Sequence, residues 1–125
     1  LKQIILMQKK KTGKLFSFCL YAVGVLAKKD NKEKKFLSVL GEEIGLLFQL
    51  ADDFLDVKGS KKLVGKPIKK DKKKGKSTLV NLMGYEKAHN YANNLKKKIL
   101  LKLKKHGKKA KDLSDIIEFI LKRNF

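Results

Sequence analysis

With 125 residues, the chain has the length of a single domain, and its apolar fraction of 42% excludes disorder throughout. Its formal charge is +20, from 32 Lys and Arg against 12 Asp and Glu. One Cys excludes a disulfide framework and a cysteine-based zinc site, and the longest uncharged stretch, Leu15 to Ala27, is shorter than the ~18 residues of a membrane span. We therefore expect a cytoplasmic protein with no stable membrane insertion.

Apolar residues recur at helical spacing along the whole chain, and no stretch alternates strictly enough for a strand. Asp30 or Asn31 is suited to cap the helix that follows. A lysine-rich loop is expected after residue 57, and Gly84 and Gly107 interrupt the helical pattern further on. The fold is therefore predicted to be all-α. The expected helices cover about residues 1–10, 12–27, 32–57, 76–83, 85–105 and 112–123.

The positive charge suggests a partner such as nucleic acid or an anionic membrane. However, Arg123 is the only arginine, and recognition of bases and phosphates favours the planar fork of Arg over Lys. The lysines are also spread over several segments without the interleaved aromatic residues that single-strand binders use. We expect no nucleic-acid partner, and we keep a Lys-rich helical module that binds nucleic acid or an anionic membrane surface as the alternative function.

The segment from Phe36 to Val57 contains no Lys or Arg, although Lys is common elsewhere in the chain. A buried helix would explain the absence of lysine, but the segment also carries acidic residues. Buried carboxylates are costly unless they are paired or bound to a metal. The acidic residues are Glu42, Glu43, Asp52, Asp53 and Asp56.

On a helical wheel at 100° per residue, the polar residues of this segment form one narrow stripe, and most of the remaining circumference is apolar. Apolar residues on nearly all sides predict a central helix that packs against several neighbours. The stripe then predicts a polar cavity. It consists of Ser38, Glu42, Gly45, Gln49, Asp52, Asp53 and Asp56.

Asp52, Asp53 and Asp56 stand at positions i, i+1 and i+4 and so present their carboxylates from one helical turn. Mg²⁺ prefers such oxygen ligands and is commonly held by one or two carboxylates together with a substrate phosphate. The other interpretation is a cluster of solvated acids, but acids near the C-terminal end of a helix are disfavoured by the helix dipole. We therefore favour a site for metal and phosphate.

Cations that could complete this site are present on both sides of the acidic turn. Lys11 and Thr12 are predicted to open the preceding helix, where a positive helix end and a Lys suit a phosphate. Lys66 and Lys76 flank the loop after the turn. In a chain so rich in Lys, each of these lysines could instead be an ordinary solvated side chain.

Several motifs stand in order along the chain: Lys11-Thr12-Gly13, then Phe48-Gln49 with Asp52, Asp53 and Asp56, then Gly65-Lys66, Gly75-Lys76 and the final Arg123-Asn124. Together they resemble the trans-isoprenyl diphosphate synthases, or polyprenyl synthetases, and above all the bacterial short-chain farnesyl and geranylgeranyl diphosphate synthases. The resemblance covers nearly the whole chain. It implies the C-terminal helices of an isoprenoid-synthase-type antiparallel bundle.

The resemblance also implies an activity, namely the Mg²⁺-dependent condensation of an allylic diphosphate with isopentenyl diphosphate to a short-chain prenyl diphosphate such as farnesyl or geranylgeranyl diphosphate. In this family a homodimer is expected for the full-length enzyme. The second Asp-rich motif would bind Mg²⁺ that bridges to the allylic diphosphate. By resemblance, Asp52, Asp53 and Asp56 are the metal ligands, Lys11, Lys66 and Lys76 bind the diphosphate, and Lys11, Thr12 and Gln49 are the catalytic residues.

The sequence departs from the family pattern in two ways. Lys69 and Lys70 precede Asp71 where a Gly is usual, and Leu79 and Val80 replace a common Tyr-Pro. Family members are also much longer, and their first Asp-rich motif has no counterpart here. We therefore expect residues 1–125 to be a single partial domain, the C-terminal part of a polyprenyl synthetase without its N-terminal half, and inactive in isolation. A terpene-cyclase-like or catalytically idle homologue is a third interpretation.

Overall fold

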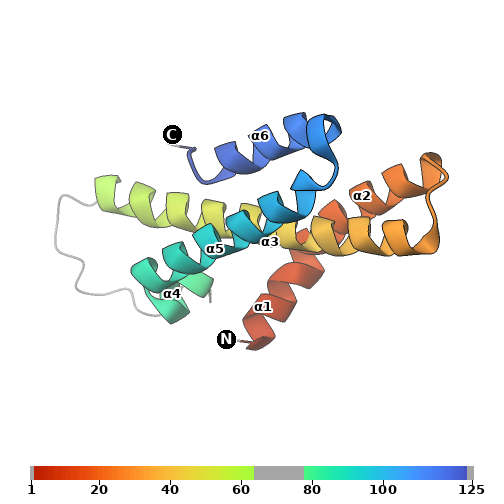
Figure 1. The fold of residues 1–125 in the computed structure, drawn as a ribbon. Coiled ribbons are helices and arrows are strands. Elements are labelled where there is room, and N and C mark those ends of the chain that lie inside the picture. The colour runs from red at the N-terminus through yellow and green to blue at the C-terminus, as the bar shows by residue number, and fades with distance from the viewer. Residues whose placement is uncertain (1, 64–77, 124–125) are drawn as a thin grey trace.

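The computed structural model describes residues 2–63 and 78–123, and for residues 8, 9 and 58–63 it describes the backbone alone. Within these residues every regular element is a helix, which confirms the predicted all-α fold (Figure 1). The elements are α1 (Lys2–Gln8), the π-helical η1 (Lys9–Gly13), α2 (Lys14–Leu26), α3 (Asn31–Leu63), α4 (Leu79–Met83), α5 (Tyr85–Lys104), the 3₁₀ helix η2 (Gly107–Ala110) and α6 (Lys111–Ile120).

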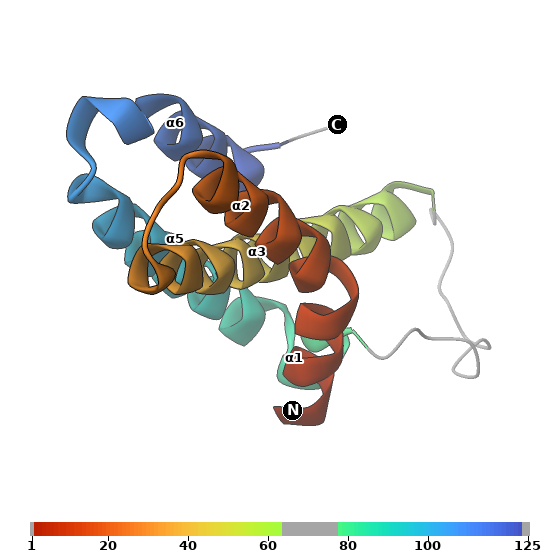
Figure 2. The same cartoon turned by 90° about the vertical axis from the view of Figure 1, so that its right-hand side faces the viewer.

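Helix α3 is the central element of the fold. It contacts η1, α2, α4, α5 and α6, and α2 and α5 lie along different sides of it in Figures 1 and 2. Its apolar side chains fill the core between these neighbours, and Leu46, Leu47 and Leu50 are fully buried. This arrangement confirms the central helix that the apolar circumference predicted. Among the side chains that the structure describes, the other large and fully buried ones are Leu40, Leu79, Ile99 and Ile117.

The beginning of α3 confirms the predicted cap, whereas its end differs from the prediction. Asp30 Oδ1 accepts a hydrogen bond of 2.7 Å from the backbone N–H of Glu33. The helix continues to Leu63, so the expected end at Val57 and the loop expected from Lys58 are wrong. A Gly such as Gly59 costs a helix only about 1 kcal/mol relative to Ala, and the single proline of the sequence, Pro67, lies beyond the observed end.

The second half of the chain follows the predicted order. Thr78 caps α4, because its Oγ1 accepts a hydrogen bond of 3.1 Å from the backbone N–H of Asn81. Gly84 then turns the chain with a φ of 81°, which favours glycine, and α5 begins at the next residue as expected. The last helix ends at Ile120, before the predicted end at 123. None of the described helices is long and apolar enough to cross a membrane.

Candidate functional site

The acidic turn of α3, residues Asp52, Asp53 and Asp56, presents three carboxylates in different surroundings. Asp53 is only 4% exposed. The side chain of Asp52 is 41% exposed, and Asp56 is exposed. Within four residues, the turn therefore contains a buried carboxylate, Asp53, and a solvent-exposed one, Asp56.

A chain of hydrogen bonds joins η1 to the buried end of the turn. The hydroxyl of Thr12 donates to Gln49 Oε1 at 3.0 Å, and Gln49 Nε2 donates to Asp53 Oδ1 at 3.1 Å. Gly45 makes this approach possible, because a Cβ there would lie 2.7 Å from the Cα of Gly13. The structure thus brings together three of the predicted site residues, Thr12, Gln49 and Asp53.

The second oxygen of the Asp53 carboxylate, Oδ2, is buried and has no hydrogen-bond partner among the described residues. Burial is the main reason that the pKa of Asp53 is raised, and the charges of Asp56 and Asp52 raise it further. The hydrogen bond from Gln49 and the backbone amide of Leu79 only partly oppose this. A buried oxygen that lacks a partner, beside two further carboxylates, is an environment that a cation would stabilise.

Asp52 has a partner that the sequence did not predict. Arg123 Nη2 lies 2.9 Å from Asp52 Oδ1, and the Arg123 side chain is only 14% exposed. The guanidinium also lies over the ring of Phe48, 4.5 Å from its centroid. The only arginine of a Lys-rich chain was a signal that could have marked this residue, because the planar guanidinium suits a paired carboxylate better than Lys does.

Of the three lysines predicted to bind diphosphate, the structure describes only Lys11. Lys11 is exposed on η1. The expectation that Lys11 and Thr12 open a helix is wrong, because α1, η1 and α2 follow one another without a break and Gly13 itself has helical φ and ψ. The described residues around Lys11 and Thr12 therefore form no helix N-terminus with unpaired backbone N–H groups. They form a π-helical turn instead, and such turns are frequent at functional sites. Lys66 and Lys76 lie outside the described residues.

The acidic turn fits a magnesium ion in its chemistry but does not form a complete metal site by itself. Over residues 2–63 and 78–123, no group of three His, Cys, Asp or Glu side chains could hold a metal ion. Magnesium, however, is usually held by only one or two carboxylates, with water and phosphate oxygens completing the shell. The unpartnered Oδ2 of Asp53 and the neighbouring carboxylates supply donors of that kind.

The N-terminal part of the polar stripe has another role than the predicted one. Instead of lining a cavity, it packs against α2. Ser38 and Ser17 share a hydrogen bond of 2.8 Å, and Lys14 Nζ lies 2.6 Å from Glu42 Oε1. The prediction of a polar cavity is therefore wrong for this part of the stripe, because small and polar side chains there let two helix backbones approach closely.

Glu43 lies outside the stripe and is the other buried acid of α3 that the sequence left unexplained. Its carboxylate receives Lys102 Nζ at 2.6 Å and Lys98 Nζ at 3.0 Å, both from α5. Burial alone would raise the pKa of Glu43, but the hydrogen bonds and charges of the two lysines outweigh it and hold the pKa below its ordinary value. This cluster joins α3 to α5 and is structural.

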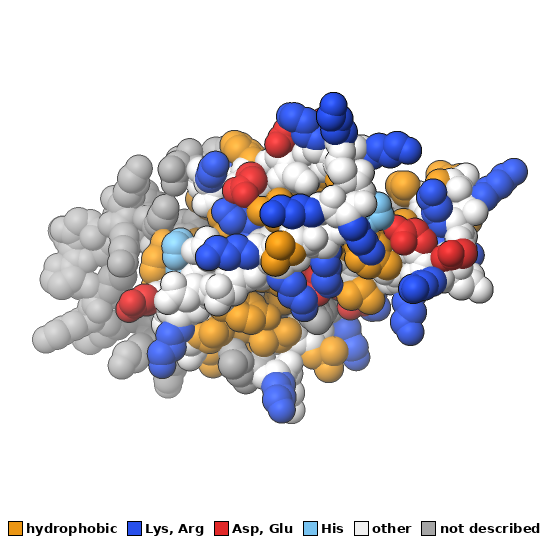
Figure 3. Space-filling model, viewed as in Figure 1, with side chains coloured by type: hydrophobic (Ala, Val, Ile, Leu, Met, Phe, Trp, Pro, Cys, Tyr) orange, Lys and Arg blue, Asp and Glu red, His pale blue; other side chains and the backbone are white. Residues whose placement is uncertain are grey.

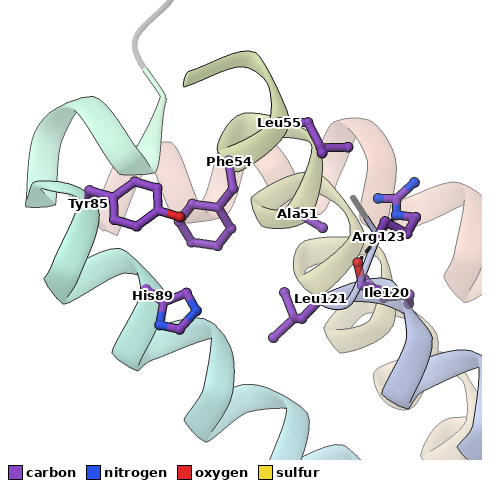
Figure 4. A pocket seen from close by; sticks show the side chains of 8 residues that line it. All are labelled: Ala51, Phe54, Leu55, Tyr85, His89, Ile120, Leu121 and Arg123. Carbon is purple, nitrogen blue, oxygen red and sulfur yellow. Dashed lines mark hydrogen bonds between the residues drawn. The ribbon is translucent and has the colours of Figure 1, made fainter. Parts of the chain in front are cut away.

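Two hollows lie near the acidic turn, and Arg123 borders both. The smaller one, drawn in Figure 4, has a volume of about 40 Å³ and lies between α3, the beginning of α5 and the end of α6. Tyr85 and His89 stack there at 6.1 Å between ring centroids, so both have packing roles. The larger one, about 420 Å³, lies between α2, α3 and α6 and is lined almost entirely by apolar side chains.

The exposed lysine side chains, called the lysine coat below, do not gather into one stripe on the face seen in Figure 3. Blue side chains are scattered over that face, with acidic and apolar side chains between them. Several lysines also have structural partners, such as Lys102 with Glu43 and Lys105, whose Nζ lies 3.4 Å from the centroid of the Phe36 ring. On this face, the positive charge therefore does not form one continuous patch.

A central helix with an acidic turn, a Thr–Gln pair hydrogen-bonded to it and helical neighbours around it are the features that the resemblance to the all-α isoprenoid-synthase class implies. Comparison with known proteins agrees with this class. The family described as polyprenyl synthetase matches residues 1–120. The chain belongs to this family.

Individual relatives fit the same family. The chain is 32% identical over 114 residues to a farnesyl diphosphate synthase of Micrococcus luteus, covering 91% of this chain and 39% of the relative. It is 34% identical over 124 residues to a geranylgeranyl diphosphate synthase of Saccharolobus solfataricus, covering 98% and 36%. A crystal structure of an FPP/GFPP synthase from Zymomonas mobilis superposes with a TM-score of 0.79 at 32% identity, covering 96% of this chain and 38% of that one. The chain thus spans about two fifths of the length of these relatives.

Proposed function

We propose that this chain is the C-terminal part of a short-chain prenyl diphosphate synthase. The complete enzyme would condense an allylic diphosphate with isopentenyl diphosphate to a product such as farnesyl or geranylgeranyl diphosphate, with Mg²⁺ as cofactor. Family membership and the names of the relatives support this proposal. The observation that carries it is the buried Asp53 carboxylate. One of its oxygens accepts the hydrogen bond from Gln49, which itself accepts from Thr12, and the other has no partner among the described residues.

In this proposal Asp52, Asp53 and Asp56 hold Mg²⁺, and Lys11, Lys66 and Lys76 bind the allylic diphosphate. When bound, the metal neutralises negative charge on the leaving diphosphate. The lysines add positive charge to the same group, which gains charge as its bond to the allylic carbon breaks. Loss of the diphosphate then leaves an allylic cation, which must be kept from bulk water.

Thr12 and Gln49 are suited to face that cation. The hydroxyl of Thr12 gives its single proton to Gln49, so only oxygen lone pairs remain for any other neighbour. Gln49 in turn directs its amide N–H toward Asp53, which fixes the orientation of its carbonyl oxygen. Two oriented oxygen dipoles can stabilise a positive charge without adding to it. Electrons from isopentenyl diphosphate then form the new carbon–carbon bond, and loss of a proton completes the condensation.

The remaining expectations belong to the same proposal. The substrates are an allylic diphosphate and isopentenyl diphosphate, the full-length enzyme is a homodimer and the protein is cytoplasmic. Residues 1–125 form one partial domain that lacks the first Asp-rich motif of the family. Because the second half of the metal site and the isopentenyl site would lie in the missing part, the isolated chain is inactive.

The proposal is tested by assaying product formation from labelled isopentenyl diphosphate and geranyl diphosphate in the presence of Mg²⁺. Two proteins are compared, the 125-residue chain and the same chain with the upstream part of its gene restored. We expect a prenyl diphosphate product from the completed enzyme alone. Asp53→Ala in the completed enzyme should lower kcat by about 100-fold or more, since it removes a group that acts on transition-state charge.

Asp112→Asn is the matched control, because this exposed acid at the start of α6 lies outside the acidic turn. It should leave kcat unchanged. Product from the isolated chain would contradict the partial domain, and full activity of Asp53→Ala would contradict the assignment of the site.

A further inference from the structure

Arg123 is held in place by three different contacts at the edge of the acidic turn. Its Nε donates a hydrogen bond of 3.2 Å to the backbone carbonyl of Ile120, at the end of α6 (Figure 4). Its guanidinium lies over the Phe48 ring, and its Nη2 donates to Asp52 Oδ1 at 2.9 Å. A long side chain that is only 14% exposed and fixed from three sides has little freedom to leave this position.

The two adjacent carboxylates of the turn are consequently anchored by different parts of the fold. Asp53 is tied through Gln49 to Thr12 on η1. Asp52 is tied to Arg123 beyond the end of α6. A positive charge therefore stands permanently beside one carboxylate of the turn, while the buried oxygen of the other has no partner among the described residues.

Such a fixed charge affects two kinds of ligand in opposite directions. A bare divalent cation at the turn is repelled by the guanidinium. A divalent cation that arrives as a complex with diphosphate carries a net negative charge and is attracted by it. Charges a few ångström apart near a protein surface interact strongly enough to change relative affinities severalfold.

From this geometry we propose that Arg123 determines the specificity of the acidic turn. It weakens the binding of a bare divalent cation and strengthens the binding of a divalent cation together with diphosphate. The inference rests on the proposed function, because it takes the turn to be the place where metal and diphosphate meet. It assigns to Arg123 the selection between free metal and the metal–diphosphate complex.

The test measures two affinities of the completed enzyme described above at about 0.15 M salt, where charges on exposed lysines are screened beyond ~8 Å. Binding of Mn²⁺ alone is followed by the electron paramagnetic resonance of free Mn²⁺. Binding of the 1:1 complex of Mg²⁺ with pyrophosphate is followed by isothermal titration calorimetry. The signal counted in each case is the part that Asp53→Asn removes, so that binding to the lysine coat is subtracted.

We expect Arg123→Gln to bind Mn²⁺ about threefold more tightly and Mg²⁺–pyrophosphate about threefold more weakly than the wild type. Arg123→Lys keeps the charge and should stay close to the wild type for both probes. Lys122→Gln removes the same charge from an exposed neighbouring side chain and should change neither affinity. Thermal unfolding of each variant checks that α6 still folds against α3.

Opposite shifts are the signature of selection, because a merely structural role of Arg123 would weaken both ligands together. Equal weakening of both probes, or no change in either, overturns this inference and leaves the proposed function intact. If the wild type shows no binding that depends on Asp53, the metal site of the proposed function fails, and this inference fails with it.

Discussion

Gly13 of η1 and Gly45 of α3 lie against each other with no room for a side chain between them. A Cβ built on Gly45 would come within 2.7 Å of the Gly13 Cα and 3.0 Å of its nitrogen. The neighbouring atoms are backbone, so they cannot move aside as the end of a flexible side chain could. This contact sets the register that places Thr12 opposite Gln49.

Gly45→Ala is therefore expected to destabilise the chain by about 1–3 kcal/mol, the usual range for overpacking a close contact. Urea unfolding followed by circular dichroism measures the loss. Gly24→Ala is the control, because the nearest atom to a Cβ there is the flexible Leu37 Cδ1, at 3.0 Å. Both substitutions gain about 1 kcal/mol of helix propensity, because Ala replaces Gly in a helix. The control should lose much less stability, because only Gly45→Ala pushes a side chain against backbone atoms. Equal effects of the two substitutions would contradict the role of the Gly13–Gly45 contact.

The central helix and its cap could be predicted from the sequence because both depend on local patterns. The apolar circumference of residues 36–57 predicted a helix packed on several sides, and Asp30 has the side chain that an N-cap requires. The predicted break at Gly84 and the amphipathic helix after it are confirmed for the same reason.

Contacts between distant segments could not be predicted in this way. The wheel placed Ser38, Glu42 and Gly45 on one face of α3, but it could not show that η1 and α2 pack against this face. The pairing of Asp52 with Arg123 joins residues 71 positions apart, and no local pattern encodes it. Residue types and their order indicate the candidate site, whereas the hydrogen-bond partners of its side chains depend on contacts between distant segments.

Glu43 and its two lysines provide a test of the buried ion cluster. Glu43→Gln should lower the stability at pH 7 by about 1–2 kcal/mol, less than for a fully buried pair because the Lys98 side chain is 62% exposed. The pKa of Glu43 is lowered in the folded state, so its contribution is present above the unfolded value of about 4.3 and is lost as the pH falls through the folded value. Urea unfolding at pH 7 and pH 3 measures both effects.

Glu42→Gln provides the matched control for Glu43. Glu42 also pairs with a lysine, Lys14, but the Glu42 side chain is itself 24% exposed, and no second lysine joins the pair within the described part of the chain. An isolated pair at the surface contributes about 0–1 kcal/mol, so this substitution should have the smaller effect at pH 7. A loss for Glu43→Gln that stays the same at pH 3 and pH 7 would show that packing, not charge, accounts for it.

Asp53 should make the protein less stable as the pH rises. Its pKa is raised in the folded state, so between the unfolded value of about 3.9 and the folded value the native state binds more protons than the unfolded chain. The free energy of unfolding therefore falls as the pH rises through this window. Asp53→Asn removes the buried charge and keeps an oxygen that can accept from Gln49. It should be about 1 kcal/mol more stable than the wild type at pH 7 and nearly equal to it at pH 4.

Magnesium gives this prediction a second readout. A cation that binds at Asp53 in the folded state raises the melting temperature of the wild type at pH 7, because a ligand of the native state alone stabilises it. Asp53→Asn should show no such rise, whereas Asp112→Asn, which changes an exposed acid, should behave like the wild type in both measurements. If Asp53→Asn were less stable than the wild type at pH 7, the charge of Asp53 would be compensated within the fold, and the turn would have no need of a cation.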